Sequence, residues 1–358
     1  QDLKSLCGVK KKGTEQQTVF NASFPGLVDL VMDNGEVFYL IKTNGILHTE
    51  REWRSDDDTR LKPPAVEDLP FALPSGEKVM AYYINDNDKK LFDDLVIHLK
   101  RFSFLQEEQW LILGFFTFLT YIQDHPDIHY LPMVLFYAVP ERGKSRTGKS
   151  LAMVSYRGVH VVDMREANLF RYSQNIRATL FLDIMDLWKK AERNGCEDIL
   201  HLRFEKGEKV SRVLYPDKGA FQDTRHYDVF GPTIMATNEA VHKILDTRCI
   251  PITMPNRPGY YDNPLVEEAV PFKERLIAWR ARNINSLLSE VQPVPGITGR
   301  LWDITKPMFQ VCSMISPDQY NNLAEAIRGV AGERVSEKRE SIEGRIIEII
   351  NDMSAGNV

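Results

Sequence analysis

The stretch Gly143-Lys144-Ser145-Arg146-Thr147-Gly148-Lys149-Ser150 decides the fold of this chain. It fits the phosphate-binding loop pattern G-x-x-x-x-G-K-[ST] at every fixed position. Because Gly makes up about 7% of average proteins, a chance match in a chain of this length is on the order of one in a hundred. The competing interpretation is a basic surface turn between a core strand and a helix.

The segments on either side supply the context that the pattern needs. Residues 131–139 form a continuous apolar run, which is typical of a strand buried on both faces, and residues 151–154 suit the first turns of a helix. The glycines would let backbone N–H groups turn toward phosphates, and the helix N-terminus would add partial positive charge. In this register Lys149 would reach the β- and γ-phosphates and the Ser150 hydroxyl would bind Mg²⁺. The stretch therefore predicts a site for ATP or GTP, with all eight residues Gly143, Lys144, Ser145, Arg146, Thr147, Gly148, Lys149 and Ser150 contacting the nucleotide.

Composition narrows the class of protein. The chain has 358 residues, a hydrophobic content of 43% and a formal net charge of −5, so binding of nucleic acid would need a local basic patch. The most apolar segment, residues 110–122, is too short to span a bilayer. The chain begins at Gln1 without a Met, so we expect a fragment of a longer polypeptide. Four cysteines lie far apart and form no C-x-x-C pair, which indicates reduced thiols of an intracellular protein: Cys7, Cys196, Cys249 and Cys312.

The region before the loop is expected to have two parts. Residues 1–20 are polar and basic, as in a linker, and residues 25–85 alternate apolar runs with turn signals. Within them, residues 37–41 and 79–84 predict strands, and Asp33-Asn34-Gly35 predicts a hairpin turn. From residue 88 to 124 the pattern becomes helical, with an aromatic-rich second helix that we expect to pack under the nucleotide domain.

After the loop, strands and helices alternate, which predicts a parallel sheet with helices on both faces. The expected strands are residues 158–162, 179–183, 233–238 and 249–254, and the expected helices between them are residues 165–177, 188–193 and 239–245. Residues 208–214 and 221–230 bracket Pro216-Asp217-Lys218-Gly219 and predict a β-hairpin with Lys218 at its tip. Its arms carry Arg212, Arg225 and His226. Helices are expected over residues 272–288, 300–314, 317–328 and 341–353.

The order of these elements resembles the AAA+ ATPases. The phosphate loop, TLFLD (residues 179–183), TIMATN (233–238) and LDTRCI (245–250) correspond to Walker A, Walker B, sensor 1 and the arginine-finger segment. A charged hairpin before sensor 1 is similar to superfamily-III-type helicases, and the best family match is the helicase half of phage and mobile-element replication proteins. The resemblance covers roughly residues 130 to 310. Only the Walker A element is specific by itself.

The resemblance implies roles for individual residues. Lys149 and Asp183 would act in catalysis, Asp183 also as a support for Mg²⁺, while Asn238 would position the attacking water or sense the γ-phosphate. Arg248 would enter the neighbouring subunit's site as a trans arginine finger. Two alternatives stay open: Asn238 as the N-cap of a following helix, and Arg248 in a surface salt bridge with Asp246. Arg300 resembles sensor 2 only loosely.

The sequence departs from the family pattern beside Asp183. The usual catalytic Glu is replaced by Ile184, so no carboxylate stands ready to orient water. Asp186 is the nearest substitute. It would share a face with Asp183 if a helical turn begins after the strand, and it would face away if the strand continues.

Taken together, the sequence predicts an α/β AAA+ P-loop NTPase core with a β-hairpin insertion, a small N-terminal α+β region and a C-terminal helical lid. The expected divisions are residues 1–87, 88–128, 129–260 and 261–358. The leading hypothesis is a hexameric ATP- and Mg²⁺-dependent DNA helicase, cytoplasmic in a bacterial or phage-infected cell, with a fused or partner primase or polymerase.

In that hypothesis Lys218, Arg212 and Arg225 hold single-stranded DNA in the pore of the ring. The alternative is an AAA+ ATPase that remodels proteins or acts as a regulatory switch. Such proteins often carry an aromatic-hydrophobic pore loop, and we expect none in this hairpin. A GTPase is disfavoured because no N-K-x-D motif follows a strand.

Overall fold

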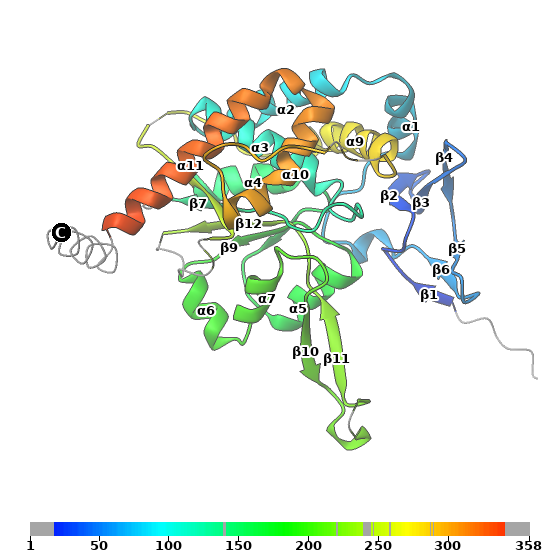
Figure 1. The fold of residues 1–358 in the computed structure, drawn as a ribbon. Helices are drawn as coiled ribbons and strands as arrows, with labels where there is room; N and C mark the ends of the chain where they lie inside the picture. Colours follow the sequence, from blue (N-terminus) through cyan, green and yellow to red (C-terminus); the bar gives the residue numbers. More distant parts are fainter. Residues whose placement is uncertain are drawn as a thin grey trace, which may run out of the picture.

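The computed structural model describes residues 18–138, 141–219, 221–238, 245, 247–257, 259–286, 288 and 290–340. Its centre is a parallel sheet of five strands with helices on both faces, as Figure 1 shows. This architecture confirms the α/β class expected from the sequence, and it is consistent with a P-loop NTPase core. The helices predicted over residues 239–245 and 341–353, and most of the linker predicted over residues 1–20, fall outside the described residues apart from short ends.

The sheet is built from the apolar runs that the sequence singled out. Its strands are β7 (Met133–Tyr137), β8 (Val159–Val161), β9 (Leu180–Asp183), β12 (Thr233–Thr237) and β13 (Cys249–Thr253), and they lie in the order β13-β7-β12-β9-β8. All four pairings are parallel, so every carboxyl end emerges at the same edge of the sheet. Because β12 separates β7 from β9, the chain that leaves β12 emerges between the loop after β7 and the end of β9.

Helices cover both faces of this sheet (Figure 1). One face carries α4 (Lys144–Val154), α2 (Asp88–Lys100), α3 (Glu107–Thr120), α9 (Val266–Asn283), α10 (Gly299–Ile315) and α11 (Tyr320–Glu340), the last preceded by the short turn η4 (Pro317–Gln319). The other face carries α5 (Glu166–Phe170) with the π-helical turn η2 (Arg171–Asn175), α6 (Leu187–Arg193) and α7 (Glu197–Leu202). Helix α3 is apolar on every side and is buried between α2, α10 and α11, which confirms its predicted packing role.

The N-terminal region consists of two small sheets and a helix. Strands β2 (Leu27–Asp33), β3 (Glu36–Thr43) and β4 (Ile46–Glu50) pair antiparallel. A second sheet has the order β1 (Thr18–Phe20), β6 (Arg60–Lys62) and β5 (Trp53–Arg54), and the short turn η1 (Val66–Asp68) follows it. The predicted turn after β2 is confirmed, because Asn34 and Gly35 both have positive φ, 48° and 80°.

The strand predicted over residues 79–84 is wrong, because these residues lie in helix α1 (Gly76–Asn85). The helix begins at an N-cap, Ser75, whose hydroxyl accepts a hydrogen bond from the backbone N–H of Lys78. Its apolar side chains pack against α9, a partner far along the chain. Tertiary packing therefore overrides the β-propensity of the Tyr-Tyr-Ile run.

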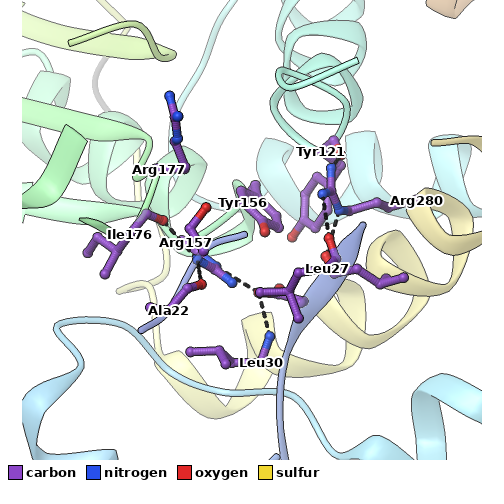
Figure 2. A network of polar contacts seen from close by, with 12 residues as sticks. Ala22, Leu27, Leu30, Tyr121, Tyr156, Arg157, Ile176, Arg177 and Arg280 are labelled. Carbon is purple, nitrogen blue, oxygen red and sulfur yellow. Dashed lines mark hydrogen bonds and ion pairs between the residues drawn. The ribbon is translucent and has the colours of Figure 1, made fainter. Parts of the chain in front are cut away.

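A network of buried charges joins the N-terminal sheet to the core (Figure 2). The Arg157 guanidinium contacts the Asp29 carboxylate of β2 at 2.7 Å and donates to the backbone oxygens of Ala22 and Ile176. Arg280 of α9 donates to the oxygen of Val28 and pairs with Asp124 at 2.6 Å. Both guanidiniums are almost completely buried, so the contact between the N-terminal sheet and the core includes polar bonds that are shielded from solvent.

The predicted hairpin is confirmed and projects away from the body of the molecule (Figure 1). It consists of β10 (Lys209–Val213) and β11 (Thr224–Asp228), with the turn η3 (Pro216–Lys218) at its far end. Three of the four cysteines, Cys196, Cys249 and Cys312, are buried and form no disulfide within the described residues, as expected; Cys7 lies outside the described residues. Within the described part of the chain, no helix is long and apolar enough to cross a membrane.

Candidate nucleotide-binding site

A cleft of about 520 Å³ lies at the carboxyl edge of the parallel sheet. Three segments form it: the loop between β7 and α4, the end of β9 and the end of β12. Its walls are Glu141, Arg142, Gly143, Lys144, Ser145, Arg146, Asp183, Ile184, Met185, Ala236, Thr237 and Asn238. Ligands of open α/β sheets bind at this edge, beyond the carboxyl ends of the strands.

Helix α4 begins at Lys144, five residues before Lys149, which the motif places at the start of the helix. Gly143 is its N-cap and has a φ of 85°, a left-handed conformation that Gly adopts without strain. The first intrahelical bond runs from the Thr147 N–H to the Gly143 oxygen. Because the first four N–H groups of a helix have no intrahelical acceptor, the anion-binding end of α4 is the segment Gly143 to Arg146.

The sequence predicted Lys149 and Ser150 at the start of the helix, and this prediction is wrong because the helix begins at Lys144. Both residues lie in the second turn of α4, where their N–H groups belong to the helix's own hydrogen bonds. Lys149 is exposed, and the buried Ser150 hydroxyl donates to the Thr147 oxygen at 2.9 Å. Gly148 faces the sheet, because a Cβ there would stand 2.2 Å from the Phe181 ring. Of the eight predicted nucleotide contacts, the cleft contains Gly143, Lys144, Ser145 and Arg146.

Two cations line the phosphate end of the cleft. The Lys144 ammonium donates to the backbone oxygen of Ala138 at 2.6 Å and so spans the loop. Burial lowers the pKa of Lys144, and the nearby Asp183 carboxylate opposes that shift. Arg142 has a buried Nη1 with no hydrogen-bond partner among the described residues, which an anionic ligand in the cleft would satisfy.

Asp183 lies where the Walker B pattern predicts, at the end of β9. Its carboxylate accepts a hydrogen bond from the Ser145 hydroxyl at 2.9 Å and lies 3.4 Å from Nε2 of His160 on β8. Hydrogen bonding from His160, and next from Ser145, lowers the pKa of Asp183 against the opposing effect of burial. No sequence motif predicted these roles of Ser145 and His160. The alternation of β8 could have indicated His160, since it follows Val159 beside the Walker B strand.

Asn238 and Asp186 have different placements. Asn238 follows β12 directly and lines the cleft between the loop and Asp183, as the sensor position requires. Its alternative role as a helix N-cap involves residues outside the described part of the chain. Asp186 has a left-handed backbone (φ 52°) and precedes α6, and it is not among the residues that line the cleft. Ile184 is 2% exposed, so the position of the usual Glu is filled by a core side chain.

Arg248 and Arg300 lie at the opposite edge of the sheet. Arg248 precedes β13, and its backbone oxygen accepts from the Met133 N–H at the start of β7. Five-residue strands separate this edge from the cleft by roughly 16 Å. Both guanidiniums stack on the Phe204 ring, at 4.6 and 4.9 Å, and burial, followed by Arg300, lowers the pKa of Arg248. Arg300 therefore does not occupy a sensor-2 position in its own site. The alternative partner of Arg248, Asp246, lies outside the described residues.

The three predicted cations of the hairpin differ in their surroundings. Arg212 pairs with Glu166 at 2.5 Å and with Asp198 at 2.9 Å, so its charge is neutralised by the body of the protein. Arg225 is exposed above the Tyr227 ring. Lys218 stands at the tip, over the ring of Tyr215 at 4.1 Å. Geometry therefore separates Arg212, which anchors the hairpin, from Lys218 and Arg225, which face solvent.

The comparisons with known proteins give structural likeness only. No protein-family model matches the chain, and no curated protein matches it. Among solved structures, a full-length MCM homolog from Methanopyrus kandleri aligns with a TM-score of 0.44 and 12% identity, over 84% of this chain and 75% of that chain. The C-terminal region of NrS-1 aligns with a TM-score of 0.31 and 13% identity, over 72% of this chain and 66% of that chain.

A third structure, the JCV helicase, aligns with a TM-score of 0.26 and 11% identity, over 71% of this chain and 76% of that chain. The resemblance to helicases drawn from the sequence is thus confirmed as a resemblance. At TM-scores this low, shared function does not follow from it. The chemistry of this chain has to be judged from its own residues.

Proposed function

We propose that this chain is an ATP-hydrolysing AAA+ motor whose triphosphate site is the cleft at the start of α4. The observation that carries the proposal is the contact between Ser145 and Asp183, which brings the second residue of the helix to the Walker B carboxylate. In this assignment the phosphate loop is residues 138–145, Lys144 binds the β- and γ-phosphates, and Ala138 stands in place of the first motif glycine.

The same pair fits a magnesium ion. Mg²⁺ prefers oxygen ligands and is usually held by one or two protein oxygens beside substrate phosphates. The Ser145 hydroxyl and the Asp183 carboxylate supply such oxygens 2.9 Å apart, and His160 keeps the carboxylate ionised and oriented. When bound, the ion would neutralise charge that develops on the phosphates. Among the described residues no cluster of three His, Cys, Asp or Glu side chains offers a competing metal site.

In this proposal, Asn238 orients the water that attacks the γ-phosphate. Its amide lines the cleft beside Asp183, whereas Ile184 offers no polar group and Asp186 lies outside the lining. An amide can align water by hydrogen bonds but is not a base at neutral pH. We therefore expect slow basal hydrolysis, raised when a partner completes the site.

The proposed partner is another copy of the chain. Arg248 lies roughly a strand length away from its own cleft, and this distance supports a role at a neighbour's site as a trans arginine finger. A closed ring, hexameric in the helicases that the motifs resemble, would direct the hairpins toward a shared channel. Lys218 at each tip would then hold single-stranded DNA, consistent with the helicase half of a phage or mobile-element replication protein that works with a primase or polymerase.

The first experiment compares the two lysines of the loop region. Lys144→Ala should lower ATP hydrolysis roughly 100-fold or more, since it removes a charged contact that strengthens in the transition state. Lys149→Ala is the matched control on the same helix and should hydrolyse ATP like the parent. The reverse result would restore the register of residues 143–150 and refute the Ser145–Asp183 assignment.

One observation favours a second function, remodelling of proteins. Contrary to the expectation from sequence, the hairpin end exposes aromatic side chains, with Phe221 100% and Tyr215 48% exposed. ATPase assays with oligothymidylate and, separately, with an unfolded protein such as casein distinguish the two. Stimulation by oligothymidylate that is lost in Lys218→Ala supports translocation on nucleic acid; stimulation by casein alone supports remodelling.

A further inference from the structure

A second polar hollow lies at the root of the hairpin, away from the nucleotide cleft. It has a volume of about 450 Å³ and lies between the strands β10 and β11 and the π-helical turn η2. Arg171, Gln174 and Asn175 come from η2, and Arg225 and Tyr227 come from β11. We call this hollow the root groove. π-Helical turns are rare and occur frequently at functional sites.

The charges around the root groove are unbalanced. Arg212 and Arg225 face each other directly across the hairpin, an arrangement in which like charges destabilise a strand pair. Arg212 is compensated by Glu166 and Asp198, but within the described residues Arg225 and Arg171 form no ion pair. Glu166, which also lines the groove, and Asp198 carry two negative charges against the three of Arg171, Arg212 and Arg225, so the cluster keeps a surplus positive charge of one (three minus two). An anion held beside Arg171 and Arg225 would offset the repulsion.

The walls of the groove are held in place before any ligand binds. Tyr227 stacks on Phe170 with ring centroids 4.1 Å apart and planes 10° from parallel, and the Arg225 guanidinium lies 5.5 Å above the Tyr227 ring. Gln174 accepts a hydrogen bond from the Asp228 N–H at 3.3 Å, which fixes that side chain at the wall. The guanidinium groups of Arg171 and Arg225 and the amide of Gln174 suit a phosphate, because two parallel N–H groups of Arg match two of its oxygens.

We propose that the root groove binds the phosphodiester backbone of single-stranded nucleic acid, with Arg171 and Arg225 as its phosphate contacts. This inference rests on the proposed translocation function and adds a second contact to the one at the tip. Strand β11 runs from the tip region into the groove, so a strand that is held at Lys218 reaches Arg225 by following the hairpin. Aromatic walls beside cations are typical of surfaces that bind single strands.

The test is fluorescence anisotropy of a labelled oligothymidylate at several salt concentrations. Each phosphate contact on a single strand contributes about 0.7 to the slope of log affinity against log salt, so Arg171→Ala/Arg225→Ala should flatten the slope by about 1.4. Affinity at low salt should fall roughly tenfold or more. Arg51→Ala/Arg54→Ala, which removes two exposed arginines of the N-terminal region, is the charge-matched control and should leave the slope as in the parent. Arg171→Lys/Arg225→Lys keeps the charge and should restore the slope but only part of the affinity.

The outcomes separate the groove from the function on which it rests. If the double alanine variant binds like the parent while Lys218→Ala weakens binding, the root groove is refuted and the tip contact stands. If the parent itself does not bind oligothymidylate, the proposed nucleic-acid function fails. A last measurement uses a fluorescent ATP analogue. If the double alanine variant loses affinity for this analogue but not for the oligonucleotide, the groove is a site for free phosphates and the proposal is overturned. Melting curves of each variant establish that it is folded.

Discussion

Gly148 allows helix α4 to pack closely against strand β9, and any larger residue would disturb this contact. A Cβ at this position would lie 2.2 Å from the Phe181 ring, so α4 can approach β9 only with no side chain here. Gly148→Ala should therefore lower the free energy of unfolding by about 1 to 3 kcal/mol, as overpacking of a core does. Denaturant unfolding of parent and variant measures the difference.

The control for this substitution is Gly329→Ala in helix α11. No atom lies within 4 Å of the Cβ that it would add, so the exchange should be neutral or raise stability by up to about 1 kcal/mol. Phe181→Leu introduced with Gly148→Ala should recover part of the loss by making room. A Gly148→Ala variant that stays as stable as the parent but no longer binds ATP would contradict this packing role.

His98 gives the stability of the protein a pH dependence. It is buried against Phe102 and Phe272, and burial, followed by the charge of Arg101, lowers its pKa from 6.5 to about 4. Between pH 6.5 and about 4, His98 is protonated in the unfolded chain and neutral in the folded chain. The free energy of unfolding therefore falls as the pH drops from about 6.5 toward 4. The loss attributable to this residue should be about 3 kcal/mol. Unfolding experiments across this pH range should show a flatter profile in His98→Leu.

For single residues, the sequence predicted the strand ends that line the cleft better than it predicted the loop between β7 and α4. Asp183 ends β9 and Asn238 directly follows β12, at the strand ends that the apolar runs predict. Two Gly-Lys-Ser triplets follow β7, and only the second, at residues 148–150, has a Gly five positions earlier. The first, at residues 143–145, has Ala138 there, but it lies one short loop after the strand, and that spacing decides where the helix begins.

The hairpin depends on Arg212 for its attachment. The guanidinium joins β10 to Glu166 of α5 and Asp198 of α7 and lies over the Phe170 ring. These contacts would hold the hairpin at a fixed angle. Hydrogen bonding to Asp198, and next to Glu166, raises the pKa of Arg212 against the opposing effect of burial. Arg212→Ala should therefore loosen the hairpin while leaving basal hydrolysis in the distant cleft as in the parent.

Hydrogen exchange of β10 and β11 measures that loosening. Asp198→Asn should raise the exchange rates in the same direction as Arg212→Ala, because it weakens the same attachment from the other side. Arg225→Ala is the control on the facing strand, since its side chain makes no ion pair with the body in the described structure. Equal exchange in the parent and Arg212→Ala would show that backbone pairing alone holds the hairpin.

Elements were predictable where local pattern and packing agree. The five core strands and the hairpin follow from apolar runs and turn residues, which act within a few positions of the chain. Helix α1 was mistaken for a strand because its packing surface is α9, nearly two hundred residues later. Helix α9 starts at Val266, before its predicted start at Phe272, although it contains Pro271. At the sixth helical position this proline removes one internal hydrogen bond, so a start after it was the expectation from sequence, and the packing of α9 against α1 overrides that expectation.

The molecule is held together across its parts by charges that no local pattern reveals. Arg157 follows α4 in sequence, yet it reaches Asp29 in the N-terminal sheet, and its own backbone has a φ of 46°. Arg280 binds the same strand from α9. The parallel-sheet core, α9 and the N-terminal sheet thus meet at two buried guanidiniums (Figure 2). Movement of any one of these parts would change the surroundings of a buried charge.

Removing one partner of this buried pair should cost far more than removing an exposed pair. Asp29→Ala leaves the Arg157 charge buried and uncompensated, and we expect a loss of about 3 to 5 kcal/mol in the free energy of unfolding. Asp58→Ala, at the exposed pair of Arg54 and Asp58, is the control and should cause only a small change. The double variant Asp29→Ala/Arg157→Met should recover much of the loss, because apolar groups can replace a buried ion pair. If Asp29→Ala proves as mild as Asp58→Ala, water must reach Arg157, and the N-terminal sheet would then be joined to the core by apolar packing rather than by this charge.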